Sequence, residues 1–154
     1  MSLLFQPYWG IVVPQPNGEI IVRALKSWDH KITATRVEDM GLIVSKILAG
    51  EIEGEDRVVF IAGDTMAYAE FADVVERVTG RVVGREVWDI EALKEALERN
   101  KKEGEDVSLE RYRYVFAGDG VAWNVEDTDS FRHGVRMMGV EEWMRKNAKS
   151  LFLS

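Results

Sequence analysis

A continuous apolar run that leads into a glycine turn and an amphipathic helix pattern is the feature that most restricts the fold of this chain. The run is RVVFIAG (57–63), and Asp64 and Thr65 follow it directly. β-Branched and aromatic residues without alternation are typical of a strand that is covered on both faces. The next residues repeat apolar side chains at helical spacing up to Gly80. The segment therefore predicts a strand, a turn and a helix of an α/β domain.

The turn at Gly63 begins as a phosphate-binding loop does, but it lacks the groups that such a loop needs. A phosphate loop uses several glycines to bring backbone N–H groups together around the anion, usually with a Lys, Ser or Thr at fixed spacing. Here one glycine is present, and the carboxylate of Asp64 would repel a phosphate. Asp64 or Thr65 as the N-cap of the next helix accounts for the turn. We therefore expect a structural role for it.

Two strands and a capped helix are predicted before the apolar run. Residues 19–25 and 30–36 carry the β-branched side chains that suit a pleated sheet. Thr35 and Glu38 have the spacing of a capping box, and apolar residues recur at helical spacing behind them. Strand 30–36, this helix and the run at 57–63 suggest a right-handed parallel crossover.

The remainder of the chain predicts one more strand, several helices and two irregular segments. The strand spans 81–90, and helices are expected from Ile90 onward and at about 108–116, 127–133 and 140–147. Residues 1–18 hold all three prolines and read as an extended segment closed by a turn at Asn17-Gly18, and residues 100–107 form a polar loop. The length of 154 residues suits a single domain over 1–154, of α/β class with a short mixed sheet and about five helices.

Composition excludes several classes of function. The formal net charge of -7 argues against nucleic acid and against an anionic membrane surface as partners, because both favour an excess of Lys and Arg. The absence of cysteine removes disulfides, thiol nucleophiles and zinc–thiolate sites. No apolar run approaches the ~20 residues of a membrane span, and the first ten residues do not have the pattern of a signal peptide. We expect a soluble, cytoplasmic protein.

The polar motifs do not form a catalytic or metal-binding pattern. His30 and His133 lie outside any metal-ligand spacing, so we expect His30 in a solvated turn, His133 at a helix end, and no metal. The turn Gly118-Asp119-Gly120 starts like a dinucleotide fingerprint, but Trp123 occupies the place of the third glycine. No G-x-S-x-G sequence is present, and catalytic residues stay unknown.

Aromatic residues supply the candidates for a ligand site. Core packing accounts for most of the five tryptophans. Phe5, Tyr8 and Trp9 instead fall in the irregular, proline-rich segment, where a cluster of aromatic side chains can line either a pocket or an interface. Both interpretations stay open from the residues themselves.

Three stretches together resemble the C-terminal half of fungal NmrA-like and isoflavone-reductase-like proteins, which are atypical short-chain dehydrogenase/reductase relatives. The stretches are ITATRVEDMGLIVSKILAG, DRVVFIAGDTMAYAEFADVVERVTGRVVGREVWDIEALKEAL and RYRYVFAGDGVAWNVEDT. The resemblance covers about residues 3–147, and its most specific parts are Thr35–Gly41 and the block from Ala62 to Arg81. It implies a truncated Rossmann-related domain and a substrate-side role for Phe5, Tyr8 and Trp9.

In that family, the N-terminal half carries the glycine-rich NADP(H) turn and a lysine used in reduction, and no position of this chain matches either. The resemblance therefore implies a small-molecule binding domain with no cofactor of its own. NADP(H) would bind only if a complementary Rossmann half is supplied. Two alternatives stay open: a portion of an NADP(H)-dependent oxidoreductase, or a regulatory protein that acts through protein contacts. A sheet shortened in this way exposes strand edges and an apolar face, so we expect a homodimer or a complementary half as partner.

Overall fold

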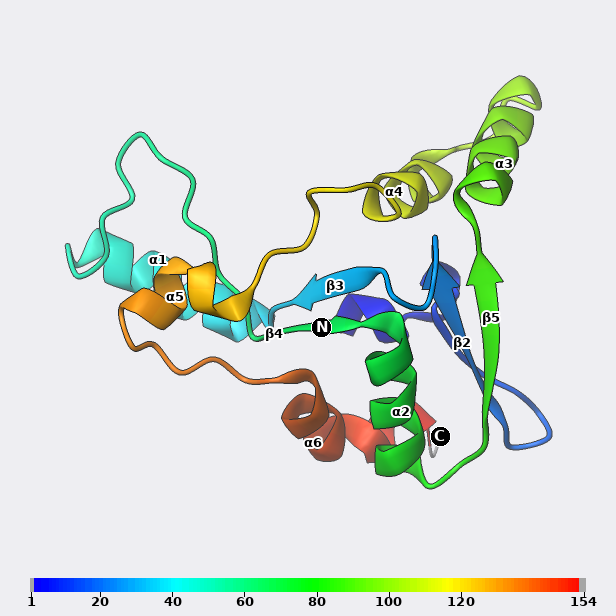
Figure 1. Ribbon diagram of the computed structural model, residues 1–154, viewed down its shortest axis with the longest axis horizontal. Helices are drawn as coiled ribbons and strands as arrows, with labels where there is room; N and C mark the ends of the chain where they lie inside the picture. Colours follow the sequence, from blue (N-terminus) through cyan, green and yellow to red (C-terminus); the bar gives the residue numbers. More distant parts are fainter. Residues whose placement is uncertain (1, 153–154) are drawn as a thin grey trace.

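A three-stranded mixed sheet forms the centre of the molecule in the computed structural model, which describes residues 2–152 (Figure 1). Strand β1 (Val12–Pro14) pairs antiparallel with β2 (Ile20–Leu25), and β2 pairs parallel with β5 (Val83–Trp88). β2 is thus the middle strand, and its alternate residues Ile20, Val22 and Ala24 are fully buried. The β-branched residues of this segment suit that position.

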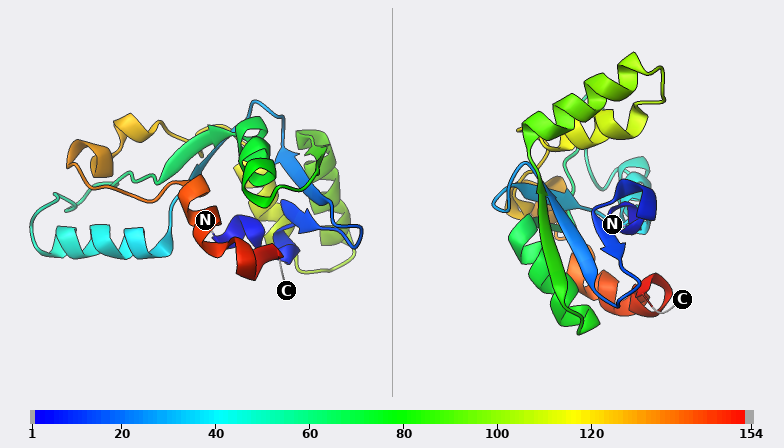
Figure 2. Two further views of the ribbon diagram at one scale, coloured as in Figure 1. Left: turned by 90° about the horizontal axis from the view of Figure 1, so that it is seen from below. Right: turned by 90° about the vertical axis from the view of Figure 1, so that its right-hand side faces the viewer.

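Two helices pack together beside the sheet and complete the core. Helix α2 (Tyr68–Thr79) runs alongside β2 and β5, and α6 (Val140–Phe152) lies against α2 (Figure 2). Phe71 and Val75 of α2 and Met144 of α6 are completely buried. The apolar stripe predicted for α2 is therefore confirmed, and the helix ends as predicted at Gly80, which takes the left-handed conformation with φ 65°.

A second group of elements extends away from the sheet. Strands β3 (Lys31–Ala34) and β4 (Asp64–Ala67) form an antiparallel ribbon that leads to helix α1 (Val37–Leu48). A loop from 49 to 63 returns beside α5 (Asp129–Arg132) and the 3-10 turn η3 (Val125–Asp127), at the left of Figure 1. The described chain is consequently elongated.

Helices α3 (Ile90–Lys102) and α4 (Ser108–Phe116) pack together at the far end of β5 (Figure 1). The carboxylate of Asp89 caps α3 by accepting a hydrogen bond of 2.8 Å from the backbone N–H of Ala92. The polar loop predicted for 100–107 is shorter than expected, because α3 continues through Lys102. The N-terminal segment contains two 3-10 turns, η1 (Ser2–Phe5) and η2 (Pro7–Trp9), before β1.

The apolar run at 57–63 is not a strand, which corrects the central prediction from the sequence. Its backbone groups bond to distant side chains and loops: the Phe60 N–H donates to the Asp129 carboxylate at 2.8 Å, and the Ile61 carbonyl accepts from the Trp123 indole at 3.0 Å. Val58 is 69% exposed and Phe60 44% exposed, so the run is not covered on both faces.

The parallel crossover predicted from strand 30–36 through the next helix to 57–63 is wrong, and the parallel connection in the structure joins two other strands. It connects β2 to β5, with β3, α1, β4 and α2 between them, whereas β3 pairs antiparallel with β4. The residues expected to cap α2, Asp64 and Thr65, belong to β4. The Asp64 carboxylate instead accepts a hydrogen bond of 3.2 Å from the Val140 N–H at the start of α6.

The predicted capping box of α1 is also wrong. The helix begins at Val37, so its N-cap is Arg36, whose side chain makes no cap hydrogen bond. The Arg36 guanidinium bonds Asp39 at 2.6 Å, and the Asp39 carboxylate accepts from the Met138 N–H at 3.0 Å. Tertiary contacts to the segment before α6 therefore fix the start of α1 in place of a local cap.

The predicted α/β class is confirmed, with a three-stranded and a two-stranded sheet and six α-helices in the described residues. Those sheets and helices are consistent with a truncated Rossmann-related domain. Strands β2 and β5, helix α4, the turn at Gly118–Gly120 and the helix-terminal position of His133 match their predictions. Across residues 2–152, no helix has both the length and the apolar character of a membrane span.

Replacing Glu141 by Gln is expected to flatten the acid dependence of stability. Hydrogen bonds from Arg77, which has the larger effect, and from Arg145 lower the pKa of Glu141 to about 2, against an ordinary value of 4.5. A lowered folded-state pKa adds stability above about pH 4.5 that is lost as the pH falls towards 2. In urea unfolding, the E141Q variant should be less stable than the parent at pH 6 and equal to it near pH 2.

Glu98→Gln serves as the control for this comparison, because Glu98 is exposed and forms no ion pair with the described residues. Added salt should reduce the E141Q difference, since the Arg77–Glu141–Arg145 cluster reaches solvent. An E141Q difference that is constant from pH 6 to pH 2 would contradict this assignment.

Candidate functional site

A mostly apolar pocket lies between β3, the N-terminal 3-10 turns and the end of α4. Its volume is about 210 Å³. We call it the Trp9 pocket; it is lined by Leu4, Trp9, Leu25, Lys31, Ile32, Thr33, Ala34, Thr35, Met40, Tyr68, Phe116 and Val121. Elements from four separate parts of the sequence therefore form one hollow.

The structure places the three aromatic residues predicted for a pocket in three different environments. Trp9 lines the pocket and is 6% exposed. Phe5 is buried in the core, where its ring stacks on Trp143 with centroids 5.3 Å apart. Tyr8 is 60% exposed and does not line the pocket. Only Trp9 of the three therefore has a position from which it can contact a ligand in this pocket.

A single guanidinium group holds the N-terminal turns against α4. Arg113 donates from Nε to the Trp9 carbonyl at 3.0 Å, and from Nη2 to the carbonyls of Tyr8 and Trp9 at 2.7 Å each. Phe116, one turn further along α4, meets the Trp9 ring edge-on at 5.7 Å. The sequence predicts the helix but contains no local signal for its partner, which lies about a hundred residues earlier.

Gly10 allows this close approach. It has φ +69°, in the region that favours glycine. A Cβ atom at this position would lie 3.0 Å from the Trp88 ring and 3.3 Å from Arg113 Nη2. A larger residue would therefore separate the N-terminal turns from the two side chains that hold them.

Tyr68 provides a buried hydroxyl at the pocket. The residue is 1% exposed, and burial raises its pKa well above the ordinary value, although a hydrogen bond with the Leu25 backbone lowers it in part. The phenol therefore stays protonated at neutral pH. His30 stacks on the Tyr68 ring at 6.3 Å, and its Nε2 lies 2.8 Å from the Phe116 carbonyl. His30 was expected in a solvated turn, and it contacts the end of α4 instead.

A hydroxyl network fixes the strand that forms one wall of the pocket. The Oγ1 atoms of Thr33 and Thr65 are 2.9 Å apart, and Thr65 donates to the Trp123 carbonyl at 2.8 Å. The Trp123 N–H donates in turn to Thr33 Oγ1 at 3.2 Å. The β3–β4 ribbon is thereby joined to the segment after α4. Thr65 does not line the pocket, but its hydroxyl contacts Thr33, which does.

The groups at this pocket suit binding by shape with a few polar contacts. Rings and aliphatic side chains form most of the wall, and the lining residues with polar groups are Lys31, Thr33, Thr35 and Tyr68. Within the described residues, no group of three His, Asp or Glu side chains converges on a point that could hold a metal ion. The arrangement resembles ordinary ligand sites, which combine an apolar lining with a small number of polar groups.

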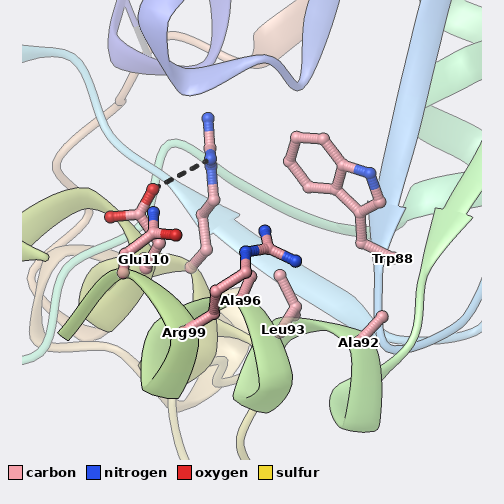
Figure 3. Close-up of a pocket in the computed structure, with 8 residues that line it drawn as sticks. Trp88, Ala92, Leu93, Ala96, Arg99 and Glu110 are labelled. Carbon is pink, nitrogen blue, oxygen red and sulfur yellow. Dashed lines mark ion pairs between the residues drawn. The ribbon is translucent and has the colours of Figure 1, made fainter. Parts of the chain in front are cut away.

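A second hollow, which we call the Trp88 cleft, opens between β5, α3 and α4 (Figure 3). It has a volume of about 300 Å³ and is lined by Trp88, Ala92, Leu93, Ala96, Arg99, Asn100, Glu110 and Arg113. Arg113 thus lines this cleft with its side chain while it bonds the backbone of Trp9, which lines the other pocket. Sequence analysis did not single out any residue of this cleft as a site.

The chain is similar to an NmrA-like family domain-containing oxidoreductase of Gibberella moniliformis (strain M3125 / FGSC 7600). The two are 37% identical over 147 residues, which is 94% of this chain and 46% of that protein. The chain therefore spans about half the length of the curated relative that it matches. No protein-family model matches the chain.

Replacing Arg113 by Met is expected to loosen the N-terminal turns. The substitution removes three hydrogen bonds from a charged donor to the carbonyls of Tyr8 and Trp9. We expect the free energy of unfolding to fall by about 2–4 kcal/mol, measured by urea denaturation. Arg111→Met is the control, because Arg111 is on the same helix and exposed. Equal losses in the two variants would contradict the role of Arg113.

Proposed function

We propose that this chain is the substrate-side region of an NmrA-like protein and acts as a small-molecule binding domain without a cofactor site of its own. The observation that carries the proposal is the Trp9 pocket, which combines apolar walls with the hydroxyl of Tyr68. The identity of 37% with an NmrA-like relative supports the family. The resemblance of three stretches of this chain to the C-terminal half of such proteins is the reason for assigning it to the substrate side.

The ligand class follows from the size and lining of the pocket. A volume of about 210 Å³ is below the range of roughly 300–1,000 Å³ that drug-sized ligands occupy. The best occupant is a small, uncharged and mainly apolar molecule, such as a monocyclic aromatic compound. One polar group on it would accept from the Tyr68 hydroxyl or bond to Thr35 or Lys31.

The alternative is that the chain works as one portion of an NADP(H)-dependent oxidoreductase. It is favoured by the name of the relative, which is an oxidoreductase, and by the match to 46% of its length. In this case, the Trp9 pocket would hold the substrate, and a complementary Rossmann half would supply the nucleotide site.

We further propose that a second copy, or such a half, covers the apolar surface of α1. Helix α1 was predicted from its apolar stripe, yet Val37, Val44 and Leu48 are 67%, 54% and 83% exposed. Among the described strands, none pairs with the outer edge of β5. An exposed apolar helix face and an open strand edge are features that proteins usually cover.

Binding of 4-ethylphenol tests the small-molecule function. This probe combines one ring with a hydroxyl, and it should bind to the parent protein and shift the NMR signals of Trp9 and Tyr68. Val121→Trp should weaken binding by about tenfold or more, because the indole would fill the mouth of the pocket. Val115→Trp is the matched control, since Val115 is 52% exposed on α4 and does not line the pocket.

Equal binding of 4-ethylphenol to the parent and to the Val121→Trp variant would refute the site. A fluorescence titration with NADPH tests whether this chain has a nucleotide site of its own. No response is expected for a domain without a nucleotide site, and micromolar binding of NADPH by this chain alone would contradict that part of the proposal.

Light scattering tests the proposed cover of α1. The parent protein should be a dimer at micromolar concentration, and a Val44→Glu, Leu48→Glu double variant should be a monomer, because two charges would enter the apolar contact. Both positions are exposed, so the variant should still fold. A monomeric parent with a cooperative melting transition would argue against a homodimer.

A further inference from the structure

The Trp88 cleft brings together cationic side chains from three separate elements. The guanidinium carbon of Arg113 on α4 lies 4.7 Å from the centroid of the Trp88 ring, and that of Arg23 on β2 lies 5.1 Å from it. Arg99 extends from α3 to line the same cleft. Figure 3 shows Arg99 and Trp88 on either side of Leu93, which forms part of the apolar floor.

Carboxylates balance this positive charge only in part. Glu86 pairs closely with Arg23 at 2.6 Å. Glu110 is 4.0 Å from Arg113 Nη1, which is within ion-pair range but too long for a hydrogen bond. Among the residues that line the cleft, the two guanidinium groups of Arg99 and Arg113 are accompanied by one carboxylate, that of Glu110, although the chain as a whole has a net charge of -7. The cleft is a local excess of positive charge on an acidic protein.

The partly buried Arg113 has donor capacity left over. Its Nε and Nη2 atoms are bonded to the carbonyls of Tyr8 and Trp9, while no described residue accepts a hydrogen bond from Nη1. The side chain is 16% exposed. Burial lowers the pKa of Arg113, and the charge of Arg23 adds to the effect, while Glu110 opposes it. An anion in the cleft would stabilise this cation.

The walls of the cleft add an apolar platform and a second polar group. The Trp88 ring, Leu93 and Ala96 present apolar surface, and the Asn100 amide can donate a hydrogen bond. Guanidinium and carboxylate groups match each other in planar, charge-assisted hydrogen bonds. Flat rings stack on an indole face, and about 300 Å³ accommodates a single ring with its carboxylate.

We propose that the Trp88 cleft is a binding site for a small aromatic carboxylate, with the carboxylate between Arg113 and Arg99 and the ring against Trp88 and Leu93. This site is separate from the Trp9 pocket, because the two hollows have no lining residue in common. The proposal does not depend on the ligand of the Trp9 pocket.

Titration with benzoate, followed by the Trp88 indole N–H signal in NMR, tests this site. Benzoate should shift that signal and saturate it, whereas the neutral analogue benzyl alcohol should bind about tenfold more weakly for lack of charge-assisted hydrogen bonds. Acetate should also bind more weakly, since it lacks the ring. Equal binding of benzoate and benzyl alcohol, or no saturable shift with benzoate, would overturn the proposal.

Three variants locate the binding. Arg99→Gln should weaken benzoate binding about fivefold or more, and Arg99 is exposed, so folding should be retained. Arg111→Gln, an exposed arginine of α4 outside the cleft, should leave binding unchanged. Val121→Trp, which blocks the Trp9 pocket, should also leave benzoate binding unchanged. Loss of benzoate binding in Val121→Trp with no effect in Arg99→Gln would place the ligand in the other pocket and refute this inference.

Discussion

One guanidinium group connects most of the parts that form a potential site in this molecule. Arg113 donates to the backbone of the N-terminal turns, lies over the Trp88 ring of the sheet, and belongs to a helix whose last residue packs on Trp9. Both hollows depend on this arrangement, since Arg113 lines one and fixes a wall of the other. The left-handed conformation of Gly10 provides the space that the contact needs.

Three carboxylates have a comparable function in the extension built around α1. Asp39 accepts from the Met138 N–H, Asp64 from the Val140 N–H, and Asp129 from the Phe60 N–H, and each of these contacts spans roughly seventy to a hundred residues of sequence. Arg36 and Arg57 pair with two of these carboxylates. The extension is therefore held to the segment before α6 and to the loop beside α5 by polar contacts, while several apolar side chains of α1, among them Val37, Val44 and Leu48, stay exposed.

Much of the secondary structure was predictable from the sequence because it follows from local pattern. The periodicity around Phe71 and Val75 predicted α2, and Gly80 predicted its end. The segment at 57–63 was wrongly predicted as a strand because an apolar run carries no information about its hydrogen-bond partners. Those partners are Asp129 and Trp123, which are distant in sequence. Trp9 was identified as a pocket candidate because it lies in an irregular, proline-rich segment. Arg113 and Tyr68 were not identified, since only the fold brings them near Trp9.

The way in which Arg113 holds the N-terminal turns has a consequence for how the site can change in evolution. The guanidinium binds carbonyl oxygens, which every residue type provides, and does not bond the side chains of Tyr8 or Trp9. The contacts of Arg113 with this segment therefore do not depend on which side chains stand at positions 8 and 9. A contact of this kind lets the side chains of a binding wall change while the backbone that positions them stays in place. New ligand preferences can therefore arise in the same fold.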